Sequence, residues 1–464
     1  MAIYAWVGAL LFVSVFVSHP ARAQSPGPAP APGLPASAPT GLWERSTLLG
    51  DVFGVRSRLE NAGVVFGLQE QSEVWGMLTG GRKQGAAYDG LTTASVKVDL
   101  DKLIGWTGGI FYGSAFQSHG NGPTGQVGNL QAISGIEATA ATRLFELWLE
   151  QSFADGKVSV RIGQQSADQE FFITSNGAIF INSAFGFPTL PALDLPSGGP
   201  AFPLATPAVR LKAKPADELT LLAAAFNGDP AGPGRDNPQL RDASGTSFRF
   251  NDGVFAVIEA QYALNQEDGA TGLPGTYRVG SFYHSGVFAD QRFDATGVSL
   301  ANPAGSGPAK SRRNNVGVYA VADQMVWRAK NMKDNGVSMF ARVFVAPDDR
   351  NLASLSANIG ATWKGAIPDR SDDTLAVGVA YVRVGDRARG LDRDTAFYTG
   401  SAYPVRSQET LVELTYQAQL TPWLQVQPSM QYVFNPGGGV LNSNNPAHRL
   451  GDAAIIGVRT GITF

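Results

Sequence analysis

KVSVRIG, residues 157–163, alternates between polar and branched aliphatic side chains. Lys157 and Arg161 fall on one parity, and Val158 and Ile162 fall on the other. Side chains of a β-strand alternate between two faces, so the stretch predicts a strand with one polar and one apolar face. A soluble sandwich would pack the apolar face on a core, whereas an outer-membrane barrel would turn it to lipid and line a lumen with the other. The rest of the chain has to decide between them.

Composition removes several classes of function. The chain has 464 residues, 55 Gly, no Cys and a formal net charge of −3. Without Cys there are no disulfides and no thiolate metal sites, and the near-neutral charge argues against nucleic acid as a partner. We therefore expect no cofactor and assign no metal site, although NQEDGATG, residues 265–272, leaves weak Ca²⁺ binding open without having the EF-hand spacing.

Three segments precede the strand-rich part of the chain. An apolar run followed by Ala21-Arg22-Ala23 predicts a signal peptide over residues 1–23, although no Lys or Arg precedes the run, so an uncleaved anchor is the alternative. Residues 24–42 are rich in Pro and Ala and predict a disordered linker. Apolar residues at helical spacing predict a short amphipathic helix over residues 43–61.

From residue 62 to residue 464 the period of two dominates and predicts an all-β chain. In RLFELWLEQSF, residues 143–153, Phe145 falls on the apolar parity and Trp148 on the other. Most such segments are about as long as the ~9–11 residues with which a tilted strand crosses a bilayer. We count sixteen segments: 62–76, 91–103, 106–118, 141–153, 157–167, 208–214, 218–227, 252–264, 276–286, 314–328, 336–346, 351–364, 374–384, 408–420, 423–434 and 452–464.

The connections between these segments alternate in length. Short ones lie at Gly105, at 154–156, at 215–217 and at Pro422. Long ones fall between them, at 119–140, 168–207, 228–250, 287–313, 385–407 and 435–451, with 347–350 as an exception. Outer-membrane barrels have short periplasmic turns and long external loops. The pattern therefore predicts a transmembrane antiparallel β-barrel of about sixteen strands.

The side chains on the polar face of the predicted strands are the candidates for the pore lining. It mixes both signs of charge, which does not suit an ion-selective ring but does suit sugar hydroxyls, which both donate and accept. Pairing between neighbouring strands is the alternative role for each of these charges. The segment 168–207 is the candidate constriction, because its many Phe rings are costly to leave in water and it should fold inward or pack onto a neighbouring loop. The candidate residues are Lys157, Arg161, Arg210, Lys212, Arg342, Glu146, Glu150, Glu413, Trp148, Phe171 and Phe172.

One stretch resembles a known family. ETLVELTYQAQLTPWLQVQPSMQYVFNPGG, residues 409–438, is similar to a late signature of the carbohydrate-selective porins of the OprB family. RIGQQSADQEFF (161–172), GTYRVGSFYHSG (275–286) and ARVFVAPDDRN (341–351) resemble the same family in the same order. The resemblance implies a sixteen-stranded outer-membrane porin that passes glucose and other neutral sugars. Sugars and membrane lipid are then the expected partners, and a homo-oligomer such as a trimer stays open.

Two other functions remain as alternatives. A barrel with a closed lumen would be structural or adhesive, and a barrel hydrolase would use one of the histidines, such as His119 or His284. No nucleophile motif accompanies either histidine, so we expect no enzyme.

The alternating connections predict the topology in the membrane. Residues 168–207 and 287–313 should face the outside of the cell, and Gly105 and Pro422 the periplasm. Because the chain has no Cys, a single introduced cysteine reports one position. A membrane-impermeant maleimide should label intact cells at cysteines in the two long segments and not at Gly105→Cys or Pro422→Cys. Labelling of Gly105→Cys on intact cells would overturn the topology.

Overall fold

The computed structural model describes residues 41–464 apart from 268–269 and 331. The predicted signal peptide, and all of the predicted linker except its last two residues, lie outside the described residues.

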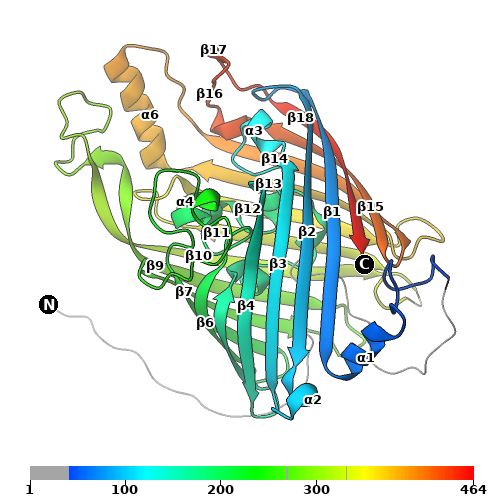
Figure 1. Cartoon of the computed structure of the whole chain (residues 1–464). Coiled ribbons are helices and arrows are strands. Elements are labelled where there is room, and N and C mark those ends of the chain that lie inside the picture. Colours follow the sequence, from blue (N-terminus) through cyan, green and yellow to red (C-terminus); the bar gives the residue numbers. More distant parts are fainter. Residues whose placement is uncertain (1–40, 268–269, 331) are drawn as a thin grey trace.

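Sixteen antiparallel strands form one closed barrel, as the sequence predicts. Each strand pairs with its neighbours in the chain, and β18 closes the barrel against β1 (Figure 1). The strands of the barrel are β1 (Val64–Thr79), β2 (Gly85–Asp99), β3 (Gly109–Asn121), β4 (Ala141–Phe153), β5 (Val158–Gln165), β6 (Thr206–Ala213), β7 (Leu219–Asn227), β8 (Val254–Leu264), β9 (Gly275–Asp294), β10 (Ala309–Arg328), β11 (Gly336–Val345), β12 (Ala353–Lys364), β13 (Thr374–Val384), β14 (Gln408–Thr421), β15 (Leu424–Phe434) and β18 (Ala453–Thr463).

Short helices and one small hairpin occupy the connections. The predicted helix over residues 43–61 is shorter in the structure: only α1 (Val55–Asn61) is helical, and residues 42–54 form turns and bends. Among the described residues, no helix is long and apolar enough to cross a membrane. The other elements are α2 (Leu100–Ile104), α3 (Thr124–Val127), α4 (Thr189–Asp194), α5 (Pro238–Arg241), α6 (Asp386–Thr399), the 3-10 turns η1 (Ala167–Gln169), η2 (Gly177–Ile179), η3 (Ser183–Phe185), η4 (Pro196–Gly198) and η5 (Pro436–Gly438), and the hairpin β16 (Leu441–Asn442) and β17 (Asn445–Arg449).

The connections alternate between the two ends of the barrel. Gly105 and Pro422 lie at one end, and the connection between β9 and β10 lies at the other. Residues 166–205, between β5 and β6, start from that second end but fold back into the barrel, where many of their side chains are buried. The expectation that this segment folds inward is therefore confirmed. Most of it is not accessible from the second end, so surface labelling has to rely on the β9–β10 connection.

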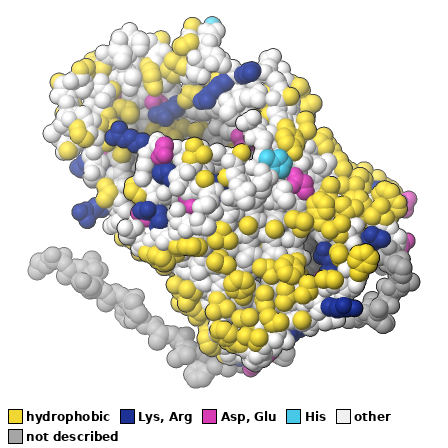
Figure 2. All heavy atoms as spheres, in the orientation of Figure 1, with side chains coloured by type: hydrophobic (Ala, Val, Ile, Leu, Met, Phe, Trp, Pro, Cys, Tyr) yellow, Lys and Arg dark blue, Asp and Glu magenta, His cyan; other side chains and the backbone are white. Residues whose placement is uncertain are grey.

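The outer wall of the barrel is mainly apolar. Val158 and Ile162 on β5 are 40% and 57% exposed, whereas Ser159 between them is buried. Val343 on β11 and Ile456 on β18 likewise face out. Figure 2 shows hydrophobic side chains gathered in a band over the outer face. An apolar outer belt is the surface that a bilayer-spanning barrel needs.

One residue departs from the predicted parity. A β-bulge shifts the pairing of β3 with β4 where Ser114 faces Glu146 and Ala115 faces Leu144. A bulge inserts one extra residue and re-aims the side chains beyond it. Phe145, predicted on the outer face, is therefore buried inside, with its ring 5.4 Å from that of Phe116.

The outer parity gives a test of register. Val343→Arg would set a cation on the outer wall in mid-strand and should lower the free energy of unfolding by about 2–4 kcal/mol. The same change at Val412 or Ile456 should have a similar effect. Gln417→Asn, on the inner parity, is the control and should change little. Urea titration of the barrel refolded into vesicles measures both, and the reverse ranking would mean that the register is off by one residue.

Candidate solute pathway in the barrel lumen

Carboxylates on the inner wall bind the backbone of residues 166–205, the connection between β5 and β6, which we call the inner loop. Glu413 accepts hydrogen bonds from the backbone N–H groups of Ile181 and Asn182, both at 2.9 Å. Glu146 accepts one from the N–H of Ser166 at 3.0 Å. Both glutamates are at most 5% exposed. They are anchors for the inner loop, so the prediction that they line the pore is wrong.

Arg342 binds the same loop through its carbonyl groups. Its guanidinium donates to the carbonyl oxygens of Phe172, Ala184 and Gly186 at 2.6–2.8 Å, and also to the side chain of Asn358. The five N–H donors of an arginine suit such a cluster of acceptors. Because Arg342 is only 1% exposed, it belongs to the loop anchor and not to the pore lining.

Further wall residues hold the loop along its length. Asp323 on β10 accepts from the hydroxyl of Thr174 at 2.6 Å and from the backbone N–H of Asn176 at 3.0 Å. Gln427 on β15 donates to the carbonyl of Ile179 at 2.7 Å. Between β8 and β15 the inner loop is therefore tied to the wall at many points.

The aromatic rings of the loop form a core. Phe171 and Phe172 are at most 1% exposed. The ring of Phe172 lies 4.8 Å from that of Tyr319 and 5.8 Å from that of Phe344, both on the wall. The expectation that these two phenylalanines line the pathway is wrong, because they pack the loop against the wall.

Four charged side chains meet on the opposite part of the wall. Glu150 on β4 accepts from Arg161 at 2.7 Å and from Arg210 at 2.8 Å. Glu170, at the start of the inner loop, accepts from Arg210 at 2.7 Å and lies 3.5 Å from Arg161. Arg210 also donates to Ser159. Two cations and two anions thus form one cluster without net charge, which we call the paired-charge cluster.

Two aromatic rings extend this cluster along the wall. The Arg161 guanidinium carbon lies 3.9 Å from the ring centroid of Trp148, a cation–π geometry. The Trp148 ring stacks on that of Tyr112, with centroids 5.0 Å apart. The cross-strand pair of Tyr112 with Trp148 sets this stack. Trp148 and Tyr112 are only partly buried, so the stack is accessible from the lumen.

Exposure distinguishes the two arginines. The side chain of Arg161 is 13% exposed and that of Glu170 is 20% exposed, whereas that of Arg210 is 1% exposed. Arg161 therefore keeps some accessible surface, and Arg210 holds the two carboxylates in place. Lys157 and Lys212 are half-buried on the same parity, nearer the end of the barrel that carries the short turns.

A second connection narrows the lumen. Glu409 on β14 accepts from the N–H groups of Leu130 and Gln131, at 2.7 and 2.9 Å. The connection between β3 and β4 is thus bound to the wall as the inner loop is. The N–H of Gly135 also donates to the carbonyl of Ile181, which joins the two loops.

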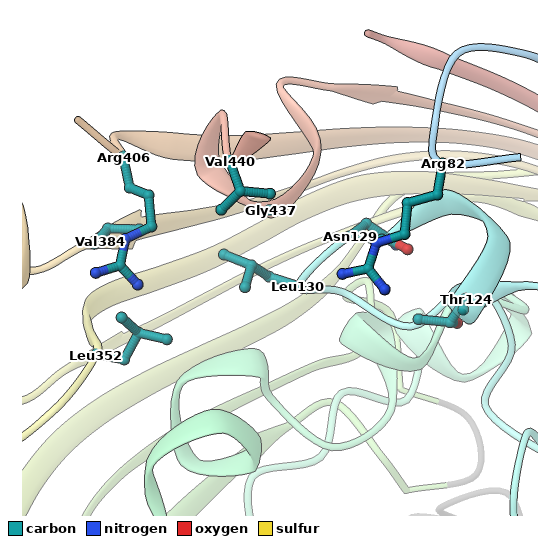
Figure 3. A pocket seen from close by; sticks show the side chains of 11 residues that line it. Arg82, Thr124, Asn129, Leu130, Leu352, Val384, Arg406, Gly437 and Val440 are labelled. Carbon is teal, nitrogen blue, oxygen red and sulfur yellow. The ribbon is translucent and has the colours of Figure 1, made fainter. Parts of the chain in front are cut away.

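A cavity of about 290 Å³ opens beside these loops, towards the end with long connections. In Figure 3, the guanidinium groups of Arg82 and Arg406 approach it from opposite sides. Arg406 is bonded to Asp392 on α6, so its charge is matched. A second ion pair, between Arg292 on β9 and Asp394 on α6, ties these two elements together. The hydrogen bonds that Arg292 donates hold the pKa of Asp394 below its usual range. The cavity is a candidate entrance to the lumen.

The two histidines considered for a hydrolase are both bonded to neighbours. The ring of His284 is buried, with the N–H of Gly286 donating to Nδ1 and the carbonyl of Gly228 2.7 Å from Nε2. His119 lies on the outer wall, within hydrogen-bond distance of Tyr88 and Gln117. In the part of the chain that the structure describes, no group of three or more His, Asp or Glu could hold a metal ion.

Sequence reasoning brought together Arg161, Arg210, Glu150 and Trp148, which form one site. It missed Glu170, because parity says nothing about a residue beyond the end of a strand. Tyr112 was detectable, since it lies on the inner parity of β3 opposite Trp148.

Comparisons with known proteins agree with the geometry. A family model described as "Carbohydrate-selective porin, OprB family" matches residues 83–464. Porin B of Pseudomonas aeruginosa is 26% identical over 367 residues, which cover 74% of this chain and 76% of that protein.

Two solved structures of Pseudomonas putida OprB have the same fold. The high-pH structure superposes with a TM-score of 0.80 at 24% identity and covers 92% of this chain and 100% of that chain. The low-pH structure gives a TM-score of 0.53 at 21% identity over 91% and 99% of the two chains.

The anchoring of the inner loop can be tested at Arg342. Arg342→Met removes the donors to three buried carbonyl groups, and each carbonyl left unpaired should cost about 1–3 kcal/mol. The loop should then leave its position, so that single-channel conductance rises and proteolysis within residues 166–205 speeds up. Lys212→Met, which removes a cation that touches no loop backbone, is the matched control. Equal protease resistance in both variants would contradict an anchoring role.

Proposed function

Because the chain belongs to the OprB family of carbohydrate-selective porins, we propose that it is an outer-membrane pore through which glucose and other neutral sugars diffuse passively into the periplasm. The first 23 residues would direct export and be removed. The apolar outer wall would contact membrane lipid. No reaction is part of this function.

The paired-charge cluster with its aromatic stack is the observation that carries the proposal. Arg161, Glu150 and Glu170 offer donors and acceptors within one small area, beside the rings of Trp148 and Tyr112. Sugar hydroxyls both donate and accept, and the C–H face of a sugar ring packs on an aromatic face. A sugar can use all of these groups at once.

The remaining lumen supports the same pathway. The inner loop is bound to the wall from β8 to β15, through residues such as Glu259, Asp323 and Glu413. The wall formed by β3 to β6 carries the half-buried groups instead. We infer that a solute passes between the inner loop and this wall, over Trp148 and Arg161.

The mixed charge argues against an ion channel. Two arginines and two glutamates cancel, so a small ion meets no net charge at the cluster. A neutral solute with many hydroxyls gains from each donor and acceptor separately. Ion selectivity would need a ring of one sign.

Uptake into liposomes tests the proposed function. Liposomes that contain the protein should swell faster in iso-osmotic glucose than in a neutral amino acid of similar size. Planar bilayers provide the second measurement, since a closed structural barrel gives no channel current. Absence of both swelling and current would reject a pore, and equal swelling with sugars and amino acids would reject the selectivity for sugars.

Arg161 gives the sharpest test of the solute contact. Arg161→Ala removes the guanidinium that faces the lumen, so glucose should bind more weakly, with an increase of about tenfold in half-saturation for a charge-assisted contact of about 1.5 kcal/mol. Ionic conductance should stay equal or rise. Arg210→Ala should act in the same direction, because Glu150 and Glu170 lose the donor that holds them.

Lys212→Ala, a cation on the same strand as Arg210 but outside the cluster, is the control. Sugar-induced current noise measures the half-saturation in all three variants. If half-saturation stays unchanged in both arginine variants while ion preference shifts, these arginines are wall charges without contact to sugar.

A further inference from the structure

Five connections of the barrel meet around the cavity of about 290 Å³, at the end with the long connections. They contribute Arg82 between β1 and β2, Leu130 between β3 and β4, Leu352 between β11 and β12, Arg406 between β13 and β14, and Val440 between β15 and β18. This volume lies near the lower end of the ~300–1,000 Å³ range of pockets that hold small ligands. The space, which we call the entrance cavity, is therefore large enough for one compact solute.

The wall of the entrance cavity is largely apolar and is held in place through its backbone. In Figure 3, Leu130 and Val440 lie between the two arginines. The N–H groups of Leu130 and Gly437 both donate to Glu409, each at 2.7 Å. The carbonyl of Val440 accepts from the N–H of Leu450 at 2.9 Å. A fixed apolar wall of this kind can bury the C–H groups of a sugar ring favourably.

The two arginines at the rim differ in how their charges are matched. Arg406 donates from Nε and Nη2 to Asp392 at 2.8–3.2 Å, and only its Nη1 takes no part in these bonds. Arg82 is exposed, and among the described residues no carboxylate forms an ion pair with it. Its turn is nevertheless fixed, because its N–H donates to the carbonyl of Gln126 at 2.8 Å and its carbonyl accepts from Asn444 at 2.9 Å. The rim therefore carries one unmatched cation on a fixed turn.

The acids beside the cavity do not neutralise Arg82. Glu409 is 0% exposed, and its oxygens already accept from three backbone N–H groups. Asp392 is held by Arg406. The side chain of Arg82 lies close over the backbone of the β3–β4 connection, since a Cβ at Gly128 would be 2.7 Å from its Nε. An anion in the cavity therefore meets a guanidinium without a competing carboxylate.

We propose that the entrance cavity is a binding site for sugar acids, monosaccharides that carry a carboxylate. The carboxylate pairs with Arg82, because a planar guanidinium can donate two parallel hydrogen bonds to it. The remaining donor of Arg406 binds a ring hydroxyl, and the C–H face of the ring packs on Leu130 and Val440. The inference deepens the proposed function and rests on it in one respect: a bound sugar acid reaches the periplasm only if the barrel is an open pore.

The chemistry of the cavity distinguishes a sugar acid from other solutes. A neutral sugar gains the apolar contact and the bond to Arg406 but leaves the charge of Arg82 unmatched. A small anion pairs with Arg82 but leaves the apolar wall uncovered. The paired-charge cluster differs, because its two arginines are already matched by two glutamates. The entrance cavity therefore favours a negative charge and a sugar ring in the same molecule.

Titration of the whole protein in detergent with D-glucuronate tests the site. Saturation-transfer NMR measures the half-saturation, and it requires no passage through the barrel. Arg82→Gln removes the cation and should raise the half-saturation about tenfold, as expected for loss of a charge-assisted contact. Lys83→Gln, at an exposed lysine in the same turn that does not line the cavity, is the matched control and should leave it unchanged. The same half-saturation in Arg82→Gln and in the unaltered protein would overturn the proposal.

Two further measurements test contact with the sugar ring. Acetate should displace glucuronate only at a concentration at least about ten times higher, since it covers none of the apolar wall. Val440→Phe fills part of the cavity and should weaken glucuronate binding about tenfold in protein that keeps its heat-dependent gel mobility. Displacement by acetate at equal concentration, or unchanged binding in the folded Val440→Phe variant, would mean that the ring does not lie in the cavity, and the assignment to sugar acids fails.

The site and the pore can fail independently. Glucuronate binding that depends on Arg82, in a barrel that gives neither swelling nor current, would support the site and reject the pore. Swelling in glucose without binding of glucuronate would reject the site and leave the pore standing.

Discussion

The hydrogen bonds between the inner wall and the backbone of residues 166–205 set the shape of the lumen. A loop that enters a barrel leaves bulk water, and its N–H and C=O groups must find partners inside. The wall supplies them from its polar parity: Glu413 and Glu146 accept from N–H groups, and Arg342 donates to carbonyls. Without these partners the loop could not stay inside, and a sixteen-stranded barrel would enclose a wide aqueous channel.

The inward-facing charges therefore fall into two groups. One group binds the inner loop, and the other forms the paired-charge cluster. Those between β8 and β15 are used by the loop and are nearly inaccessible, as Arg342 and Glu413 are. Glu150 on β4 and Arg161 on β5 instead pair with each other and with Arg210 and Glu170, and both keep some exposure, whereas Glu146 on β4 belongs to the first group. The asymmetry follows from the loop itself, because it starts and ends on β5 and β6 and crosses to the far wall. The near wall therefore keeps the accessible charges, where we propose that a solute passes.

The sequence predicts which residues form strands and to which face each side chain points. It does not predict which partner an inward-facing side chain binds. Alternation is a local property, so all sixteen strands and the outward side of Val343 follow from it. Glu150 and Glu413 show the same alternation, yet one lies in the paired-charge cluster and the other binds the inner loop. The difference depends on where a 40-residue connection folds, which no strand period encodes.

The alternation in the sequence also does not reveal local irregularities such as a β-bulge. The bulge that turns Phe145 inward adds one residue to β4. Inward and outward positions are therefore exchanged between the bulge and the start of the strand. The rings of Phe171 and Phe172 carry no sign in the sequence of whether they face a solute or a core. Their burial depends on Tyr319 and Phe344, which are far away in the chain. Long-range packing of this kind is visible only in three dimensions.

The pairing within the cluster also bears on how fast a solute can leave. A free guanidinium would bind a polar solute tightly and hold an anion most tightly of all. Arg161 instead donates to Glu150 and stacks on Trp148, so its orientation is fixed and much of its hydrogen-bonding capacity is already used. On the proposed function, a sugar would bind only through the remaining donors and through the carboxylate lone pairs, and each such exchange would gain little free energy. Passage through a pore needs binding that is strong enough for entry and weak enough for release. A neutral, pre-paired cluster would meet both conditions if sugars pass over it as proposed.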